Sequence, residues 1–373
     1  IVIAGPVIGP TLGGYIVTNI GWRWIFFINV PVGIGAVAMC ASALPKDGAL
    51  ATNAPIDWLA IALLAIGLGS FETFLEEGYS DDWFDSPFIT LMAVLAVTGI
   101  FFFIVRTIRS KHPVVDLRVL RYRSLAAGSV LSIVVGMALY GALFAIPIFA
   151  STVMHYTAQE IGLLLLPGAL GSAVMMPIAG ALVRRFDPRI LLAAGAAILA
   201  FAVLWLGQLT TSTSAEDLFA PLLVRAFGTV LMFLPLSMSA IGPLPKKDIA
   251  AATAIYNLTR QLGGSVGVAL LTTMLGTREA FHRGVLVEKL ATTDPGVQSR
   301  LSALTNSFVA KGADIVSAKQ RALTILSGTV NIQSAVLSFN DIFWVTALLV
   351  AGTLPLVFLL GKPTAPNAAS GAH

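Results

Sequence analysis

Charged residues are scarce in this chain of 373 residues, because Asp, Glu, Lys and Arg together make up only 11% of it. That is about half their share in an ordinary soluble domain. Cysteine is almost missing, and the single Cys40 excludes an internal disulfide and a thiol pair for metal binding. We expect Cys40 to be a small buried side chain within an apolar span. The composition therefore excludes a soluble globular protein and a disulfide-stapled one.

Enzyme signatures are also missing from the sequence. The chain has no His-Glu-x-x-His motif and no glycine-rich phosphate loop followed by lysine, and its four histidines are scattered over different loops. We therefore expect a protein that is not an enzyme, with no metal site and no cofactor. The net charge of +4 does not indicate a nucleic-acid partner, because the basic residues follow a membrane pattern instead.

Long apolar runs are what the chain does have. Each has roughly the twenty residues that a helix needs to cross a hydrocarbon core of about 30 Å. Ten such runs are present, at about 1–18, 24–44, 56–74, 87–105, 125–150, 161–183, 190–209, 219–241, 252–275 and 339–361. The sequence therefore predicts an all-α polytopic membrane protein in contact with lipid.

The basic residues follow one set of loops. Thirteen Lys and Arg lie in alternate short loops and the C-terminal tail, whereas the other short loops contain only Arg23. Such an excess marks the cytoplasmic side of a membrane, so we expect a cytoplasmic C-terminus and a first run directed outward. The chain starts with Ile1 inside an apolar run and without a signal peptide. We therefore expect a fragment that lacks its N-terminal part.

The polar segment 276–338 is the longest connection, and we expect it on the outer side. Apolar residues recur at helical spacing in 297–310 and in 315–326, which predicts a subdomain of short helices. Two interpretations stay open. The segment is either a solvated cap over the last two spans or a docking surface for an extracytoplasmic partner.

The first run is unusual because it combines helix-breaking residues with an apolar composition. Gly5, Gly9 and Gly13 recur every four residues, so they lie on one helical face and allow another backbone to approach closely. Pro10 and the earlier Pro6 each remove a backbone donor and bend a helix. We therefore expect a kinked, closely packed helix beside an aromatic hinge.

These motifs resemble a known family. The run Gly9-Pro10-Thr11-Leu12-Gly13-Gly14, with the aromatic stretch 22–31 after it, is similar to the fifth-span signature of the fourteen-span drug:proton antiporters of the major facilitator superfamily, the EmrB/QacA type. Three later blocks agree in order: 113–117, 166–169 and 257–267. The block 341–344 and the last three residues look most like the EmrB branch of that family.

The resemblance implies a major facilitator fold with about ten of fourteen spans present, and a chain that starts in span five. The main proton-coupling acid of the family is then expected in the missing first span. The implied parts are the last two spans of an N-terminal bundle (1–44), two linker spans (45–110), a C-terminal bundle (111–275 and 339–361), the outer loop 276–338 and a cytoplasmic tail (362–373). One loop departs from the family pattern, since Arg184 stands where an acid is usual and Asp187 where glycine is usual.

The implied function is a proton-coupled multidrug exporter in the inner (plasma) membrane. Its ligands are expected to be amphipathic or lipophilic drugs and protons, and its expected partners are a membrane-fusion protein and an outer-membrane channel. A hypothesis of a different class is a non-transporting scaffold or receptor that recruits a partner through 276–338.

Ionisable side chains inside spans are the best candidates for a site, because each costs roughly 2.5–3.5 kcal/mol at the centre of a helix in a bilayer. Arg225 is expected either to line a transport cavity or to bind nearby backbone carbonyls. Arg260 lies nearer the cytoplasmic end, where it either snorkels and pairs at the helix end or contacts substrate. Asn257 and Gln261 share its face and are expected to hydrogen-bond across helices.

Aromatic and acidic residues complete the set of candidates. Tyr140 and Phe144 lie on one face of a glycine-containing span, either as packing residues or as an adaptable apolar wall. Glu72 near the outer end of its span is an interfacial acid or, as a weaker hypothesis, a proton relay. Asp57 is expected to cap the span that follows it. Asp341, with Trp344, is expected to anchor the last span at the membrane interface.

Overall fold

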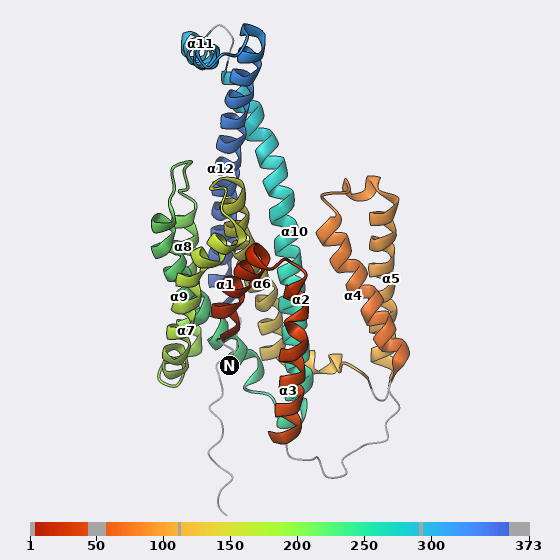
Figure 1. Ribbon diagram of the computed structural model, residues 1–373. Coiled ribbons are helices and arrows are strands. Elements are labelled where there is room, and N and C mark those ends of the chain that lie inside the picture. Colours follow the sequence, from red (N-terminus) through yellow and green to blue (C-terminus); the bar gives the residue numbers. More distant parts are fainter. Residues whose placement is uncertain (1–3, 44–56, 111–112, 291–293, 358–373) are drawn as a thin grey trace, which may run out of the picture.

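Helices make up the whole of the regular structure in the residues that the computed structural model describes, namely 4–43, 57–110, 113–290 and 294–357 (Figure 1). The α-helices there are α1 (Ala4–Asn19), α2 (Trp24–Phe27), α3 (Asn29–Ala43), α4 (Trp58–Glu77), α5 (Pro87–Arg109), α6 (Arg123–Thr152), α7 (Ala158–Val183), α8 (Pro188–Leu206), α9 (Ala215–Ile241), α10 (Ile249–Lys289), α11 (Pro295–Ala310) and α12 (Ile315–Val357). Three short 3-10 helices occur in the connections: η1 (Trp83–Asp85), η2 (Leu117–Arg121) and η3 (Lys246–Asp248). The predicted tail 362–373 and the loop 45–55 lie outside the described residues.

Each predicted span corresponds to a helix or a helix pair, which confirms the all-α prediction. Eight of the described helical segments are long and apolar enough to cross a membrane. Two predicted spans fall outside these eight. The first is α1, which is described over 16 residues, and the second is α10, whose first third carries Asn257, Arg260 and Gln261.

Six helices (α6, α7, α8, α9, α10 and α12) form one bundle with a continuous apolar core. Phe149 of α6 meets Phe339 of α12 edge to face, with ring centroids 5.4 Å apart. Glycines let neighbouring helices touch through their backbones. A side chain at Gly195 of α8 would come within 2.6 Å of the Met232 nitrogen of α9, and one at Gly267 of α10 within 2.6 Å of the Met137 Cα of α6. Small residues of this kind are how helices pack closely inside membranes.

The expected aromatic hinge is a break between α2 and α3 at Ile28. Pro31 explains its position, because proline has no N–H to donate to the carbonyl of Phe27 four residues earlier. No residue of α3 is buried in the structure. Cys40 is accordingly exposed, and the prediction of a buried thiol is wrong, because no described element packs against this part of α3.

Helices α4 and α5 form an antiparallel hairpin beside the bundle (Figure 1). Asp57 caps α4 as predicted, since its carboxylate accepts a 3.0 Å hydrogen bond from the Ala60 N–H. The same carboxylate accepts from Arg106 Nε of α5 at 2.9 Å. The Ala60 backbone bond and the Arg106 guanidinium hold the pKa of Asp57 below its usual value. This ion pair joins the two ends of the hairpin.

The segment 276–338 differs from the prediction of separate short helices. The stretch 297–310 does form its own helix, α11. The stretch 315–326, however, is the beginning of α12, and α10 continues to Lys289 without a break. No proline lies in residues 276–289 or in residues 315–326 to end α10 or α12 there. At about 1.5 Å per residue, the 41 residues of α10 and the 43 of α12 extend well past a core of about 30 Å. They project from the bundle with α11 across their tip (Figure 1).

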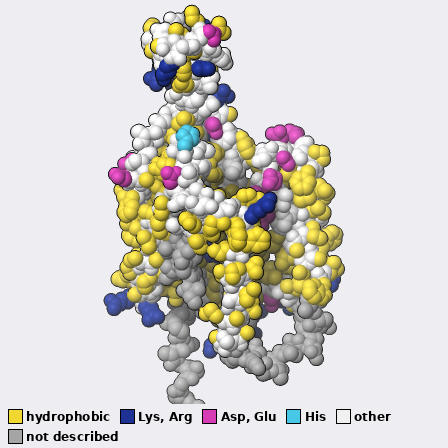
Figure 2. All heavy atoms as spheres, viewed as in Figure 1, with side chains coloured by type: hydrophobic (Ala, Val, Ile, Leu, Met, Phe, Trp, Pro, Cys, Tyr) yellow, Lys and Arg dark blue, Asp and Glu magenta, His cyan; other side chains and the backbone are white. Residues whose placement is uncertain are grey.

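Charge separates the two ends of the bundle. Lys and Arg gather at one end and Asp and Glu near the other, with mainly hydrophobic side chains in the band between them (Figure 2). We call these the basic end, which includes Arg184, Arg185 and Lys246, and the acidic end, which includes Glu76, Glu160 and Glu216. Asp187, which stands where glycine is usual, has a structural role in the loop 184–187. Its side chain caps α8 by accepting a hydrogen bond from the Arg189 N–H at 2.9 Å. The projecting helices extend beyond the acidic end.

Helix α1 packs against α7 near the acidic end. Gly14 makes the close contact, since a side chain there would come within 2.9 Å of the Ala158 carbonyl carbon. Asn19 Nδ2 donates to Gln159 Oε1 at 3.2 Å one turn further on. Gly9 and Gly13 have no atom of the described residues within 4 Å of the position that a Cβ would take. The close approach expected at these two glycines is therefore made by their neighbour Gly14.

We expect Gly14→Val to separate α1 from α7, because the added side chain has only backbone atoms to displace. The measurement is disulfide cross-linking of Asn19→Cys with Gln159→Cys in a Cys40→Ser background, and Gly14→Val should reduce its yield several-fold. Gly33→Val is the matched control, since Gly33 of α3 has open space around it. Equal cross-linking in Gly14→Val and in the control would contradict the contact.

Candidate functional site

Helix α9 places Arg225 in the middle of the bundle. The helix begins with a capping box, in which Asp217 accepts from the Ser214 N–H at 2.8 Å and donates its own N–H to Ser214 Oγ at 3.4 Å. From this fixed start Arg225 lies ten residues along the helix, which is about 15 Å from the acidic end. The residue is only 9% exposed. The cost of burying a charge at this depth is what makes it a candidate.

A small cavity of about 130 Å³ lies beside Arg225, lined by α6, α7 and α9. Its walls are mainly apolar, with Ser172 of α7 and Thr229 of α9 as the neutral polar residues. The other lining residues are Leu139, Leu143, Leu165, Gly168, Ala169 and Ala226. Ser172 Oγ already donates to the Gly168 carbonyl at 2.9 Å. Arg225 is therefore the single charged residue among those that line the cavity.

Arg225 does not bind backbone carbonyls within the described part of the chain. Its Nε is buried without a hydrogen-bond partner there, and the ion pairs of the described residues do not include it. Of the two interpretations left open by the sequence, the structure favours the one in which Arg225 faces a cavity.

Arg260 of α10 crosses to α9 instead of pairing at the helix end. Its guanidinium carbon lies 4.7 Å from the centroid of the Phe233 ring, a cation–π contact. Its Nε is buried without a hydrogen-bond partner among the described residues, as is the hydroxyl of Tyr256 one turn earlier. Phe233 and Tyr256 were not candidates from the sequence, because nothing in their spacing relates either of them to α9–α10 contact.

The other predicted cavity residues separate into two groups. The Tyr140 ring packs on Gly264 of α10, so close that a side chain at Gly264 would come within 2.7 Å of it, and it is a packing residue. Phe144 is 48% exposed. Asn257 and Gln261 are exposed as well. The cross-helix hydrogen bonds expected of their side chains are not made within the described residues.

Glu72 joins the α4–α5 hairpin to the bundle. Its Oε1 accepts a 3.0 Å hydrogen bond from Ser265 Oγ of α10. In the turn just after α4, the Tyr79 ring occupies the space in which a side chain at Gly276 of α10 would lie. Glu72 is thus more than an interfacial acid, since it makes a specific contact with the helix that carries Arg260.

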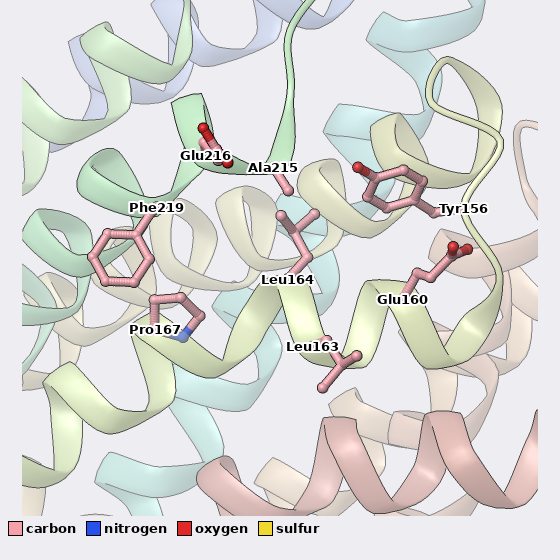
Figure 3. A pocket seen from close by; sticks show the side chains of 8 residues that line it. All are labelled: Tyr156, Glu160, Leu163, Leu164, Pro167, Ala215, Glu216 and Phe219. Atoms are coloured by element: carbon pink, nitrogen blue, oxygen red, sulfur yellow. The ribbon is translucent and has the colours of Figure 1, made fainter.

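A second, larger pocket of about 650 Å³ opens at the acidic end between α7 and α9 (Figure 3). Leu163, Leu164, Pro167 and Phe219 give it apolar walls. Two carboxylates, Glu160 and Glu216, lie among its lining residues. Leu164 and Gly168 are one turn apart on α7, so this pocket lies directly beyond the Arg225 cavity along the same helix pair.

Asp341 of α12 has a different role from the predicted interface anchor. Its Oδ2 lies 2.8 Å from His282 Nε2 and 3.1 Å from Arg278 Nε, both on α10. This cluster fastens α10 to α12 where the two helices leave the bundle. Sequence reasoning did not find this cluster, because His282 and Asp341 are 59 residues apart in the chain.

Comparison with known proteins places the chain in a family. The family model of the Major Facilitator Superfamily matches residues 1–268. The chain is 32% identical over 376 residues to the multidrug export protein EmrB of Escherichia coli (strain K12), covering 100% of this chain and 72% of that protein. It is 27% identical over 372 residues to the fatty acid resistance protein FarB of Neisseria gonorrhoeae, covering 100% and 71%. It is 28% identical over 359 residues to the colistin resistance protein EmrB of Acinetobacter baumannii, covering 96% and 70%.

The family model covers more than half of the chain, and the similarity to the Escherichia coli protein runs over the whole length of this chain. Together with the all-helical bundle, these matches confirm the resemblance expected from the glycine-proline motif. The chain belongs to the Major Facilitator Superfamily of membrane transporters and is similar to its EmrB-type multidrug exporters.

Proposed function

We propose that this transporter is a secondary exporter, which moves amphipathic or lipophilic compounds out across the inner membrane in exchange for protons. The observation that carries the proposal is the arginine held at mid-depth of the bundle beside a cavity. Charged residues inside a membrane are costly and mark substrate or ion pathways. Rocking of two helical bundles about such a central site gives alternating access.

The relatives support a broad substrate range. Their names refer to multiple drugs, to fatty acids and to colistin, which differ greatly in size and charge. The mainly apolar walls of the two pockets between α7 and α9 suit such a range, because apolar contact does not depend on the pattern of hydrogen-bonding groups.

The orientation and the division into parts belong to the same proposal. The basic end faces the cytoplasm, since Lys and Arg are enriched in the loops there. Helices α1 to α3 belong to an N-terminal bundle, α4 and α5 are a linker pair, and the six-helix bundle is the C-terminal half.

Proton coupling is tested in inverted membrane vesicles that contain the full-length protein. Uptake of a fluorescent drug should require a pH gradient, and collapsing that gradient with nigericin and potassium should abolish uptake within the response time of the assay. The control is ATP depletion at a constant gradient, which should leave uptake unchanged. Undiminished uptake without a gradient would contradict the antiporter.

Glu72 allows a sharper test of where protons pass. We expect Glu72→Gln to retain gradient-driven uptake, because an amide oxygen still accepts from the Ser265 hydroxyl and the main coupling acid is expected elsewhere. Ser265→Ala removes the same hydrogen bond from the other side and controls for loss of contact. If Glu72→Gln alone abolishes coupling while Ser265→Ala does not, then Glu72 is a proton relay.

A second candidate function, the recruitment of a partner, is favoured by the projecting helices. Ile315 and Val316 at the tip are 72% and 79% exposed, which is unusual for neighbouring large apolar residues outside a membrane. We propose that this tip contacts a membrane-fusion protein that leads to an outer-membrane channel. The scaffold hypothesis differs only in that no transport accompanies this contact.

The docking test uses Ile315→Ser combined with Val316→Ser. We expect the double variant to lose co-purification with the membrane-fusion protein and to keep vesicle uptake, because the tip lies far from Arg225. Arg300→Ser on α11 is the control for a surface change near the tip. Unchanged co-purification would exclude the tip as a docking site, and absence of uptake in the unmodified protein would favour the scaffold.

A further inference from the structure

The buried charge of Arg225 has no counter-charge in the described part of the chain. Three other arginines have a partner on a neighbouring helix: Arg106 pairs with Asp57, Arg278 pairs with Asp341, and Arg260 lies over the face of Phe233. Arg225 has neither a carboxylate nor an aromatic face among the described residues. Since an arginine stays protonated at any physiological pH, a positive charge remains beside the cavity.

The cavity offers a second donor but no acidic acceptor. Its lining residues include the hydroxyl of Thr229, one turn from Arg225 on the same helix, and no Asp or Glu. Gly168 of α7 lies opposite the guanidinium, since a Cβ at this position would be 3.9 Å from Arg225 Nη2. An apolar cavity with a guanidinium and a hydroxyl suits an anion, since burial without a counter-charge is costly and a bound anion removes that cost.

We propose that this cavity binds the anionic head group, such as a carboxylate, of a lipophilic substrate. Arg225 recognises the charge through charge-assisted hydrogen bonds. This inference rests on the proposed function and specifies it, because it assigns a sign of charge to the transported compound that the sequence did not assign.

The size of the two pockets decides how such a substrate lies. A cavity of about 130 Å³ holds a head group, since one water molecule takes about 30 Å³, but it does not hold a whole drug. The pocket of about 650 Å³ one turn outward has the apolar walls that a hydrocarbon or aromatic tail needs (Figure 3). Glu160 and Glu216 at its lining disfavour a second negative charge there. The substrate therefore carries its negative charge at one end.

The test measures equilibrium binding to the purified full-length protein by calorimetry, without any gradient. The probes are decanoate and decyltrimethylammonium, which share a tail and differ in the sign of the head group. We expect the unmodified protein to bind decanoate more tightly. Arg225→Gln should weaken decanoate binding at least about tenfold, the size of a lost charge-assisted hydrogen bond, without weakening binding of the cation.

Two further variants serve as controls. Arg225→Lys should restore part of the decanoate affinity, because it keeps the charge and loses the forked geometry. Arg300→Gln removes the same charge from the exposed helix α11 and should change neither ligand. Thermal unfolding in detergent provides an independent readout, since Arg225→Gln should not lower the midpoint without ligand if the arginine has no internal partner.

Several results would overturn the inference. Equal affinity for the two probes in the unmodified protein would do so without any variant, and so would decanoate binding that is unaffected in Arg225→Gln. A large fall in the unfolding midpoint of Arg225→Gln would show that a group of the protein itself, and not a ligand, pairs with the arginine. Binding and coupling are separate measurements. Export that does not depend on the proton gradient would therefore refute the proposed function and leave the anion site intact. Gradient-driven export without preferential binding of decanoate would refute the anion site and leave the proposed function intact.

Discussion

Lipid removes the usual reason for helices to associate, because an apolar side chain is as well solvated by hydrocarbon as by another helix. The six-helix bundle consequently depends on backbone contact at glycine. Gly195 and Gly228 bring α8 against α9, and Gly263 and Gly267 bring α10 against α6. At each of these positions a side chain would collide with backbone atoms of the partner. The arrangement of the bundle is set by where side chains are missing.

Close packing also determines what a charge can do inside the bundle. Where two helices touch through glycine, there is no room between them for a long side chain. Arg260 lies over the Phe233 ring. Arg225 faces a gap that is not filled by a charged or aromatic partner from the described residues. The two buried arginines therefore differ, since Arg260 packs on an aromatic ring and Arg225 lies beside a cavity.

The sequence predicted the number and positions of the helices well, because length and apolar composition alone decide whether a segment crosses a membrane. It also singled out Arg225, Arg260 and Glu72 as charges within apolar runs, and the structure places them on α9, α10 and α4. It failed on contacts between distant segments. The Ser265 partner of Glu72 and the His282 partner of Asp341 follow from tertiary packing, which periodicity does not report. The exposure of Cys40 and the continuity of α12 through 315–326 were missed for the same reason.

Helix α10 links the hairpin, the bundle and the projecting tip, since it carries Arg260, the Ser265 contact with α4 and the His282 contact with α12. It contains no proline over its 41 residues, so it behaves as a stiff rod. From Arg260 to Lys289 that rod is about 43 Å long. A tilt of about 10° at the depth of Arg260 thus displaces the tip by about 7 Å. Because it is a stiff rod, the helix would turn a small tilt at the depth of Arg260 into a displacement of several ångströms at the tip.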